Sequence, residues 1–160
     1  MNNIVCFWKP FEDNGIFSNW YYCKFTDEHG IQFENSEQYM MYYKAQLFND
    51  ISTANKILKV SDPKIIKELG RQVKNFNEEI WKQNCKNIVY WGCYYKFSQN
   101  LNLKKKLIDT KDKILVETSA YDKIWRSGLN KYDTKRLVQS AWPGKNWLGE
   151  CLMNVRNNLK

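Results

Sequence analysis

The pattern of apolar and polar positions changes at Asn35 and separates a β-containing start from a helical remainder. Residues 1–34 place β-branched and aromatic residues between turn residues, as in NIVCFWKP, EDNG and FSNWYYCKFTDEHGIQF. Short runs of this kind, bounded by Gly, Pro, Asn and Asp, predict strands. We therefore expect a small N-terminal β element, with a hairpin around Asp27 to Gly30 and a loop at GIFSNW.

From Asn35 onward the apolar residues recur at helical spacing. Asn35 or Ser36 can cap a helix, and Gln38, three residues after Asn35, suits a capping box. This helix is predicted to end at about Asn49. The segments DISTANKILKV and SDPKIIKELGRQV predict a second and a third helix, and Asp62 caps the third, with a proline in its first turn.

The second half of the chain predicts more helix and a single short strand. NEEIWKQNCKNIVYWGCYYKF predicts a long buried helix, and LNLKKKLIDT a shorter one after a break at Asn100. ILVETSA predicts a strand, YDKIWRSGL and SAWPGKNWLG predict loops, and NWLGECLMNVRNNL predicts a closing helix. The expected fold class is mainly α with a small N-terminal β element, in one domain over residues 1–160.

The charge balance narrows the class of partner. Lys and Arg number 25 against 17 Asp and Glu, a formal net charge of +8. This excess favours anionic partners such as nucleotides, nucleic acid or phosphorylated metabolites, although a generic basic surface gives the same count. The seven Trp and ten Tyr supply flat faces for packing or for stacking on a ligand.

The scarcity of histidine excludes several kinds of active site. His29 is the one histidine of the sequence, so histidine triads and two-histidine metal sites are excluded. Proton chemistry would have to use carboxylates, lysine or tyrosine. The five cysteines show no CxxC spacing, so we expect no disulfide framework, metal or cofactor. No segment predicts a signal peptide or a membrane span, and we expect a cytoplasmic protein, with the nucleus as the alternative.

The first predicted helix carries two charges among aromatic and apolar residues. Glu37, Met41, Lys44 and Phe48 follow a spacing that puts them on one helical face. At ~1.5 Å per residue Glu37 and Lys44 lie roughly 10 Å apart along the axis, a span that can flank a bound sugar. The alternative is structural, because a first-turn carboxylate is stabilised by the helix dipole and a lysine can extend from an apolar face.

Several segments together resemble one known family. The chain resembles the NADAR superfamily, which includes the YbiA-like N-glycosidases, through GIFSNW, FENSEQYMMYYKAQLFND, DPKIIKELGRQV, IWKQNCKNIVYWGCYYKF, LVETSAYDKIW and GKNWLGECLMNVR, in the family's order. The resemblance implies a mainly helical fold and hydrolysis of the bond between a ribose carbon and a nitrogen. It implies two substrate classes: ribosylamino-pyrimidine intermediates of riboflavin synthesis, and guanine that carries ADP-ribose.

Carried over by position, the resemblance assigns roles to particular residues. The family's functional carboxylates fall on Glu37 and Asp122, its helix lysine on Lys44, and its pocket tryptophans on Trp81 and Trp125. A carboxylate near the anomeric carbon would stabilise oxocarbenium-like charge, and the other would act as general acid or base. Lys44 also permits a covalent route through a Schiff base.

Two arginines are candidates for phosphate contacts, which would make them substrate-binding residues. Arg71 and Arg126 can each donate paired hydrogen bonds to a phosphate, although either can also be a surface arginine. Arg126 departs from the family pattern, which usually has glycine after the tryptophan at position 125. Substrate preference near Trp125 is therefore expected to differ.

These observations leave four hypotheses for function. The leading one is an N-glycosidase that removes ADP-ribose from guanine in nucleic acid, because the +8 charge suits a polyanionic substrate. The alternatives are an N-glycosidase of riboflavin intermediates, a non-catalytic module that binds ADP-ribose or NAD, and a basic helical nucleic-acid binder. No membrane and no obligate protein partner is inferred.

Overall fold

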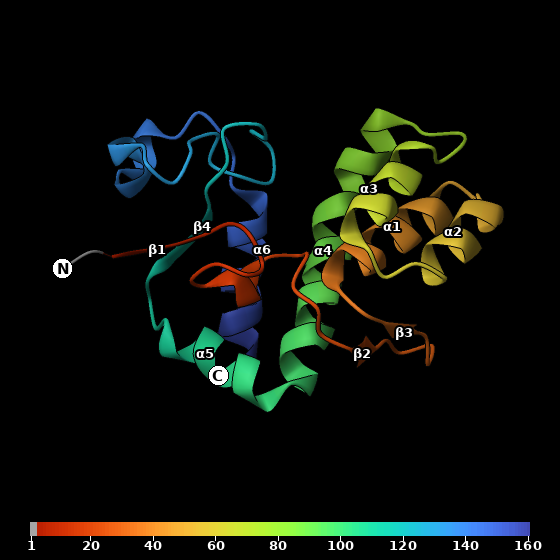
Figure 1. The fold of residues 1–160 in the computed structure, drawn as a ribbon, viewed down its shortest axis with the longest axis horizontal. Helices are drawn as coiled ribbons and strands as arrows, with labels where there is room; N and C mark the ends of the chain where they lie inside the picture. The colour runs from red at the N-terminus through yellow and green to blue at the C-terminus, as the bar shows by residue number, and fades with distance from the viewer. Residues whose placement is uncertain (1–2) are drawn as a thin grey trace. The chain divides into compact units, whose positions relative to one another are not determined.

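The computed structural model describes residues 3–160, and the chain divides into two compact units (Figure 1). Tyr22–Asn100 forms one unit, which we call the inserted unit because it is continuous in sequence. Met1–Tyr21 and Leu101–Lys160 together form the other, which we call the terminal unit. The prediction of one domain over residues 1–160 stays a prediction.

Four helices make up most of the inserted unit, and the first of them packs against the other three (Figure 1). Glycines permit this packing. A Cβ atom at Gly92 would lie 2.7 Å from Cδ1 of Tyr39, and one at Gly70 would lie 2.0 Å from Sδ of Met41. The helices are α1 (Ser36–Leu47), α2 (Ile51–Leu58), α3 (Pro63–Arg71) and α4 (Glu78–Gln99).

Each of these helices begins at a polar side chain that accepts a hydrogen bond from a first-turn N–H, which satisfies a backbone group that the helix itself leaves unpaired. The four caps are Asn35, Asp50, Asp62 and Asn77. The predicted capping box is altered. Oε1 of Gln38 accepts from the N–H of Glu34 at 2.8 Å, and its Nε2 donates to the carbonyl of Val60 at 2.8 Å. Gln38 therefore ties α1 to the end of α2 as well as to its own start.

The predicted hairpin is confirmed in the inserted unit. Strands β2 (Phe25–Thr26) and β3 (Gln32–Phe33) pair antiparallel. Oδ1 of Asp27 accepts hydrogen bonds from the N–H groups of His29 and Ile31, each at 2.9 Å, which closes the turn. Gly30 has a φ of 78°, a left-handed conformation that glycine adopts at little cost.

The terminal unit is built on two strands that lie far apart in the sequence (Figure 1). β1 (Ile4–Phe7) pairs in parallel with β4 (Ile114–Glu117), so that Phe7 lies opposite Glu117. The N-terminal strand is thus part of a sheet that the sequence did not predict, because its partner lies far along the chain. Helix α6 (Trp147–Leu159) packs against β4, and helix α5 (Leu101–Asp109) packs against α6. The 3₁₀ helices lie at Gly15–Phe17, Thr134–Leu137 and Gln139–Ala141.

Helix α6 packs against β4 through a close approach of their backbones. Asn146, the residue before α6, has a φ of 54°, and its Nδ2 donates to the carbonyl of Leu115 at 2.9 Å. A Cβ atom at Gly149 would lie 2.1 Å from that same carbonyl oxygen. The start of α6 is therefore held close to the backbone of β4.

The fold is mainly helical, as predicted. None of the helices within residues 3–160 is both long and apolar enough to span a bilayer.

Candidate active site

Helix α1 presents the predicted carboxylate and lysine on one face. Glu37 is buried in the first turn, two residues after the Asn35 cap, where the partial positive charge of the helix N-terminus favours a carboxylate. The charge of Glu37 reaches Lys44, where it acts to raise the pKa of the amine. The structure thus places Glu37 and Lys44 on one helix, as their spacing predicted, and their catalytic roles stay a prediction.

The amine of Lys44 is partly desolvated and lies beside two aromatic rings. Its Nζ donates to the carbonyl of Gly70 at 2.8 Å and lies 4.7 Å from the ring centroid of Phe76 and 5.5 Å from that of Trp81. Burial lowers the pKa of this amine, Glu37 opposes that effect, and the nearby positive charge of Arg71 adds to it. The free-base form of Lys44 is thus more accessible near neutral pH than that of an exposed lysine.

Four predicted residues therefore gather in the inserted unit. Trp81, in the first turn of α4, contributes a half-buried ring to the surroundings of Lys44. Arg71, in the last turn of α3, is exposed and pairs with Glu68, with 3.5 Å between Nη1 and Oε2. A surface pair of this kind contributes little to stability and leaves the guanidinium open to another anion. The role of Arg71 in binding phosphate stays a prediction.

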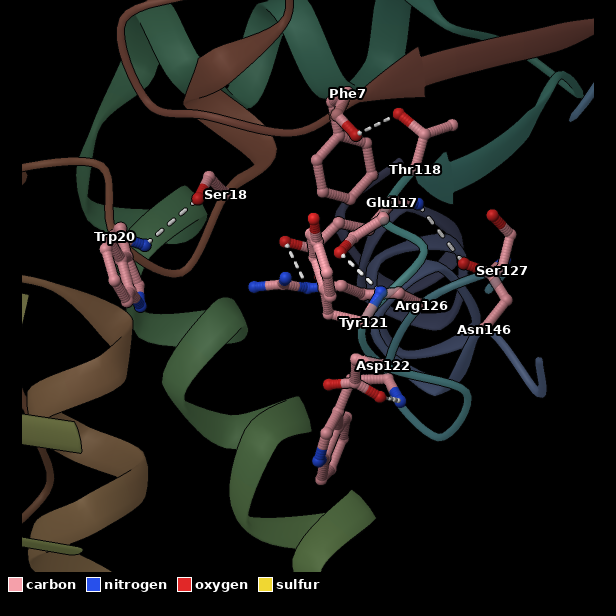
Figure 2. Close-up of polar contacts among 12 residues, drawn as sticks. Phe7, Ser18, Trp20, Glu117, Thr118, Tyr121, Asp122, Arg126, Ser127 and Asn146 are labelled. Carbon is pink, nitrogen blue, oxygen red and sulfur yellow. Dashed lines mark hydrogen bonds and ion pairs between the residues drawn. The ribbon is translucent and has the colours of Figure 1, made fainter. Parts of the chain in front are cut away.

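The other predicted residues lie in the terminal unit, on the loop that follows β4 (Figure 2). Oδ1 of Asp122 accepts hydrogen bonds from the N–H groups of Ile124 and Trp125, at 2.8 and 2.9 Å. Within residues 3–160 its second oxygen has no hydrogen-bond donor. Trp125 packs edge to face with Trp147, with ring centroids 5.7 Å apart. A sandwich of Trp81 and Trp125 around a base stays a prediction.

Arg126 pairs with a buried carboxylate that sequence analysis did not single out. Nε of Arg126 lies 3.1 Å from Oε1 of Glu117, and the two side chains are 20% and 5% exposed. Figure 2 shows them directed toward each other. The Nε–H is not aligned with a hydrogen-bond acceptor, so the contact is mainly electrostatic. The positive charge of Arg126 is thus balanced by the Glu117 carboxylate within the terminal unit. The contact of Arg126 with a phosphate stays a prediction.

Glu117 occupies the last position of β4, where its backbone is fixed by two neighbours. Its N–H donates to Oδ1 of Asn146 at 3.3 Å, and its carbonyl accepts from the N–H of Ser127 at 2.9 Å. The signal in the sequence was an acidic residue at the end of an apolar strand. A buried acid in that position requires a partner, and the arginine that replaces the usual glycine supplies one.

The side chains offer no metal site within the described part of the chain. Among residues 3–160 no group of three or more His, Cys, Asp or Glu side chains could hold a metal ion. All five cysteines are free thiols, and burial raises the pKa of Cys93 to about 12. The reactive groups that α1 contributes are the Glu37 carboxylate and the Lys44 amine.

The family assignment comes from comparison with known proteins. The profile of the NADAR domain matches residues 6–160. The chain belongs to the NADAR domain family. This NADAR domain is 43% identical over 145 residues to an N-glycosidase of Acanthamoeba polyphaga mimivirus, a match that covers 88% of this chain and 85% of the relative.

Two further matches bear on fold and activity. The NMR structure of the Escherichia coli protein YbiA is similar to this NADAR domain with a TM-score of 0.80 and 27% identity, over 99% of this chain and 86% of that one. A riboflavin biosynthesis protein of Vibrio vulnificus is 29% identical over 160 residues, which is 100% of this chain and 40% of that protein. The resemblance and the helical fold class predicted from sequence are confirmed.

Proposed function

We propose that this NADAR domain is a hydrolase of N-glycosyl bonds that removes ADP-ribose from ADP-ribosylated guanine in nucleic acid. The hydrolytic activity is supported by the relatives that are named N-glycosidases, in a mimivirus and in Shigella flexneri. The observation that carries the proposal is the face of α1, which holds the buried Glu37 and the partly desolvated Lys44, whose amine lies beside the rings of Phe76 and Trp81. The +8 charge supports a polyanionic substrate.

Cleavage of the bond between ribose C1 and nitrogen builds positive charge on the sugar. In the proposed reaction Glu37 stabilises this charge more in the transition state than in the ground state. The role of general acid or base, which the family resemblance assigns to Asp122, stays a prediction; one Asp122 oxygen accepts from the Ile124 and Trp125 amides, and the other is open within residues 3–160. Water supplies the hydroxyl that ends on C1, and the guanine nitrogen takes the proton.

Lys44 provides a covalent version of the same reaction. Its neutral Nζ adds to C1 of the ring-opened sugar, the bond from C1 to the guanine nitrogen breaks, and guanine leaves with a proton. Water then hydrolyses the resulting imine, which returns the free amine and releases ADP-ribose. The lowered pKa of Lys44 supports this route because it raises the fraction of nucleophilic amine.

The proposal is tested with a DNA oligonucleotide that carries ADP-ribosylated guanine. We expect mass spectrometry to detect released ADP-ribose and restored guanine. We expect Glu37→Gln to lower kcat by at least about 100-fold, which is typical for loss of one group that stabilises the transition state. Glu68→Gln, which alters an exposed acid on α3, is the control and should retain activity. Full activity in Glu37→Gln would contradict the role of Glu37.

The covalent route has its own test. Borohydride added during turnover should reduce the imine and attach the mass of the sugar to Lys44, as located by peptide mapping. Lys64→Met on α3 should trap as the wild type does, whereas Lys44→Met should not. Product formation without any adduct on Lys44 would favour direct attack by water.

A second candidate function is hydrolysis of ribosylamino-pyrimidine intermediates of riboflavin synthesis. The relative in Vibrio vulnificus, named as a riboflavin biosynthesis protein, favours it. Such an activity would not be inhibited by unmodified DNA, whereas removal of ADP-ribose from nucleic acid would be. Turnover of the pyrimidine alone would therefore move the assignment to this function. Binding of ADP-ribose without turnover of either substrate would indicate a non-catalytic module.

A further inference from the structure

Tyr121 exposes a large aromatic side chain on a rigid loop. It is 92% exposed, and so contributes almost nothing to the core. Hydrogen bonds hold the loop, because the Tyr121 N–H donates to Oγ of Ser119 at 3.3 Å and Oδ1 of Asp122 accepts from the N–H groups of Ile124 and Trp125. Figure 2 shows Tyr121 and Asp122 on this loop. An aromatic ring held in solvent next to a predicted catalytic carboxylate suggests a ligand contact.

Two exposed lysines lie on this loop and on the loop before α6, and Nζ of Lys145 lies 5.1 Å from the ring centroid of Trp147. The Lys145 N–H donates to the carbonyl of Lys123 at 2.8 Å, and the Trp147 N–H donates to that of Ile124 at 3.1 Å, so the loop before α6 is joined to the Tyr121 loop. Within residues 3–160 neither lysine pairs with a carboxylate. We name Tyr121, Lys123 and Lys145 the Tyr121 patch.

The chemistry of the Tyr121 patch fits single-stranded nucleic acid. Aromatic side chains stack on any base, and ammonium groups neutralise backbone phosphates, which together form the usual surface for an unpaired strand. We infer that the Tyr121 patch binds single-stranded nucleic acid. This inference rests on the proposed function for the modified base, but the surface can be tested without turnover. It also explains how the enzyme would distinguish a strand from a free nucleotide.

The first experiment measures binding of a fluorescein-labelled, unmodified single-stranded oligonucleotide by anisotropy. Tyr121→Ala is expected to raise Kd by roughly 5- to 150-fold, the usual range for loss of one stacked base. Tyr121→Phe should bind as the wild type does, because stacking uses the ring and not the hydroxyl. Phe11→Ala removes another aromatic side chain, 80% exposed, and is the control, with no change expected.

The second experiment follows the same binding as a function of salt. Replacing both lysines, Lys123→Gln and Lys145→Gln, should reduce the slope of log K against log salt by about 1.4, because each phosphate contact on a single strand contributes roughly 0.7. The control changes the net charge equally outside the patch, with Lys56→Gln and Lys59→Gln on and after α2. An equal loss of slope in both double variants would overturn the inference.

The third experiment relates the patch to turnover. Tyr121→Ala should lower kcat/KM for the modified oligonucleotide but leave kcat/KM for free ADP-ribosylated guanosine unchanged. An equal loss on both substrates, or an unchanged Kd for the oligonucleotide, would overturn the inference. Absence of turnover on either substrate, with binding that still depends on Tyr121, would overturn the proposed function and support the patch. The two failures are therefore distinguishable.

Discussion

Burial of Lys96 makes the stability of the protein depend on pH. Lys96 is 1% exposed in α4, and desolvation lowers the pKa of its amine from 10.5 to about 8, opposed by the nearby Cys93 and Cys23 thiols. Between these two values the unfolded chain binds the proton and the folded chain does not. Stability therefore rises with pH across that window, by about 3 kcal/mol at most from this group.

We expect Lys96→Met to lose this part of the pH dependence. Urea unfolding of both proteins between pH 7 and pH 10 gives the difference in the free energy of unfolding, in which contributions common to both cancel. The increase in the free energy of unfolding that Lys96→Met produces should be largest at pH 7 and should become smaller toward pH 10. Parallel curves over the whole range would contradict the lowered pKa.

The pKa of Lys44 should respond in opposite directions to two neighbouring charges. Glu37→Gln removes a charge that raises this pKa, so the pKa should fall. Arg71→Gln removes a charge that lowers it, so the pKa should rise. Acetylation of Lys44 as a function of pH, followed by peptide mass spectrometry, reports the fraction of free amine. If the pKa of Lys44 shifted in the same direction in both variants, the expected electrostatic effect of Glu37 or of Arg71 on Lys44 would be contradicted.

Removing Arg126 should destabilise the terminal unit. Arg126→Gly restores the usual family residue but leaves the buried Glu117 carboxylate without the guanidinium. We expect a loss of about 2 kcal/mol, below the 3–5 kcal/mol of a fully buried pair because Arg126 is partly exposed. Adding Glu117→Gln should recover part of the loss. A double-mutant cycle by urea unfolding measures the coupling, and additivity of the two changes would contradict it.

At the scale of elements, the packing of α6 against β4 depends on Gly149. Gly149→Ala would force its Cβ atom against the Leu115 carbonyl and the Asn146 side chain. We expect a loss of roughly 1–3 kcal/mol or more, because overpacking against backbone cannot be relieved by a rotamer change. Thermal unfolding measures the loss. Asn154→Ala, on an exposed position of the same helix, should be neutral or slightly stabilising.

The helices were predictable because their signals are local. The Asn35 and Asp62 caps and the apolar period between them depend on neighbours in sequence, and the structure confirms helices that begin one residue after each cap. The parallel pairing of β1 with β4 was not predictable in this way. Its register joins distant residues such as Phe7 and Glu117, and no turn between them specifies it.

The candidate site also contains residues that local sequence patterns predict and residues that they do not. Glu37 and Lys44 were placed on one face from helical spacing alone, since both belong to α1. The pairing of Glu117 with Arg126 depends on how a loop folds back beside β4, which the Asn146 side chain arranges through bonds to Leu115 and Glu117. This contact depends on the left-handed conformation of Asn146 and on β4, which is distant in sequence, so no local sequence pattern predicts it.

At the scale of the whole molecule, the excess of basic residues predicts sensitivity to ionic strength. With a formal charge of +8, capture of an oligonucleotide should weaken steeply as salt rises, while capture of a free nucleoside substrate should change little. We expect kcat/KM for the modified oligonucleotide to fall by at least about tenfold between 50 and 200 mM salt. Equal salt dependence for both substrates would contradict a long polyanionic substrate. The cytoplasmic location stays a prediction.

The division of the chain into an inserted and a terminal unit has a consequence for its synthesis. Tyr22–Asn100 is continuous in sequence and is synthesised before β4, whereas β1 must wait for β4. At the usual rate of 5–20 residues per second, the 17 residues from Leu101 to the end of β4 at Glu117 take about 1–3 s to make. During that interval the first strand is exposed with an unpaired edge, so the nascent chain would depend on chaperones at this stage more than at any later one.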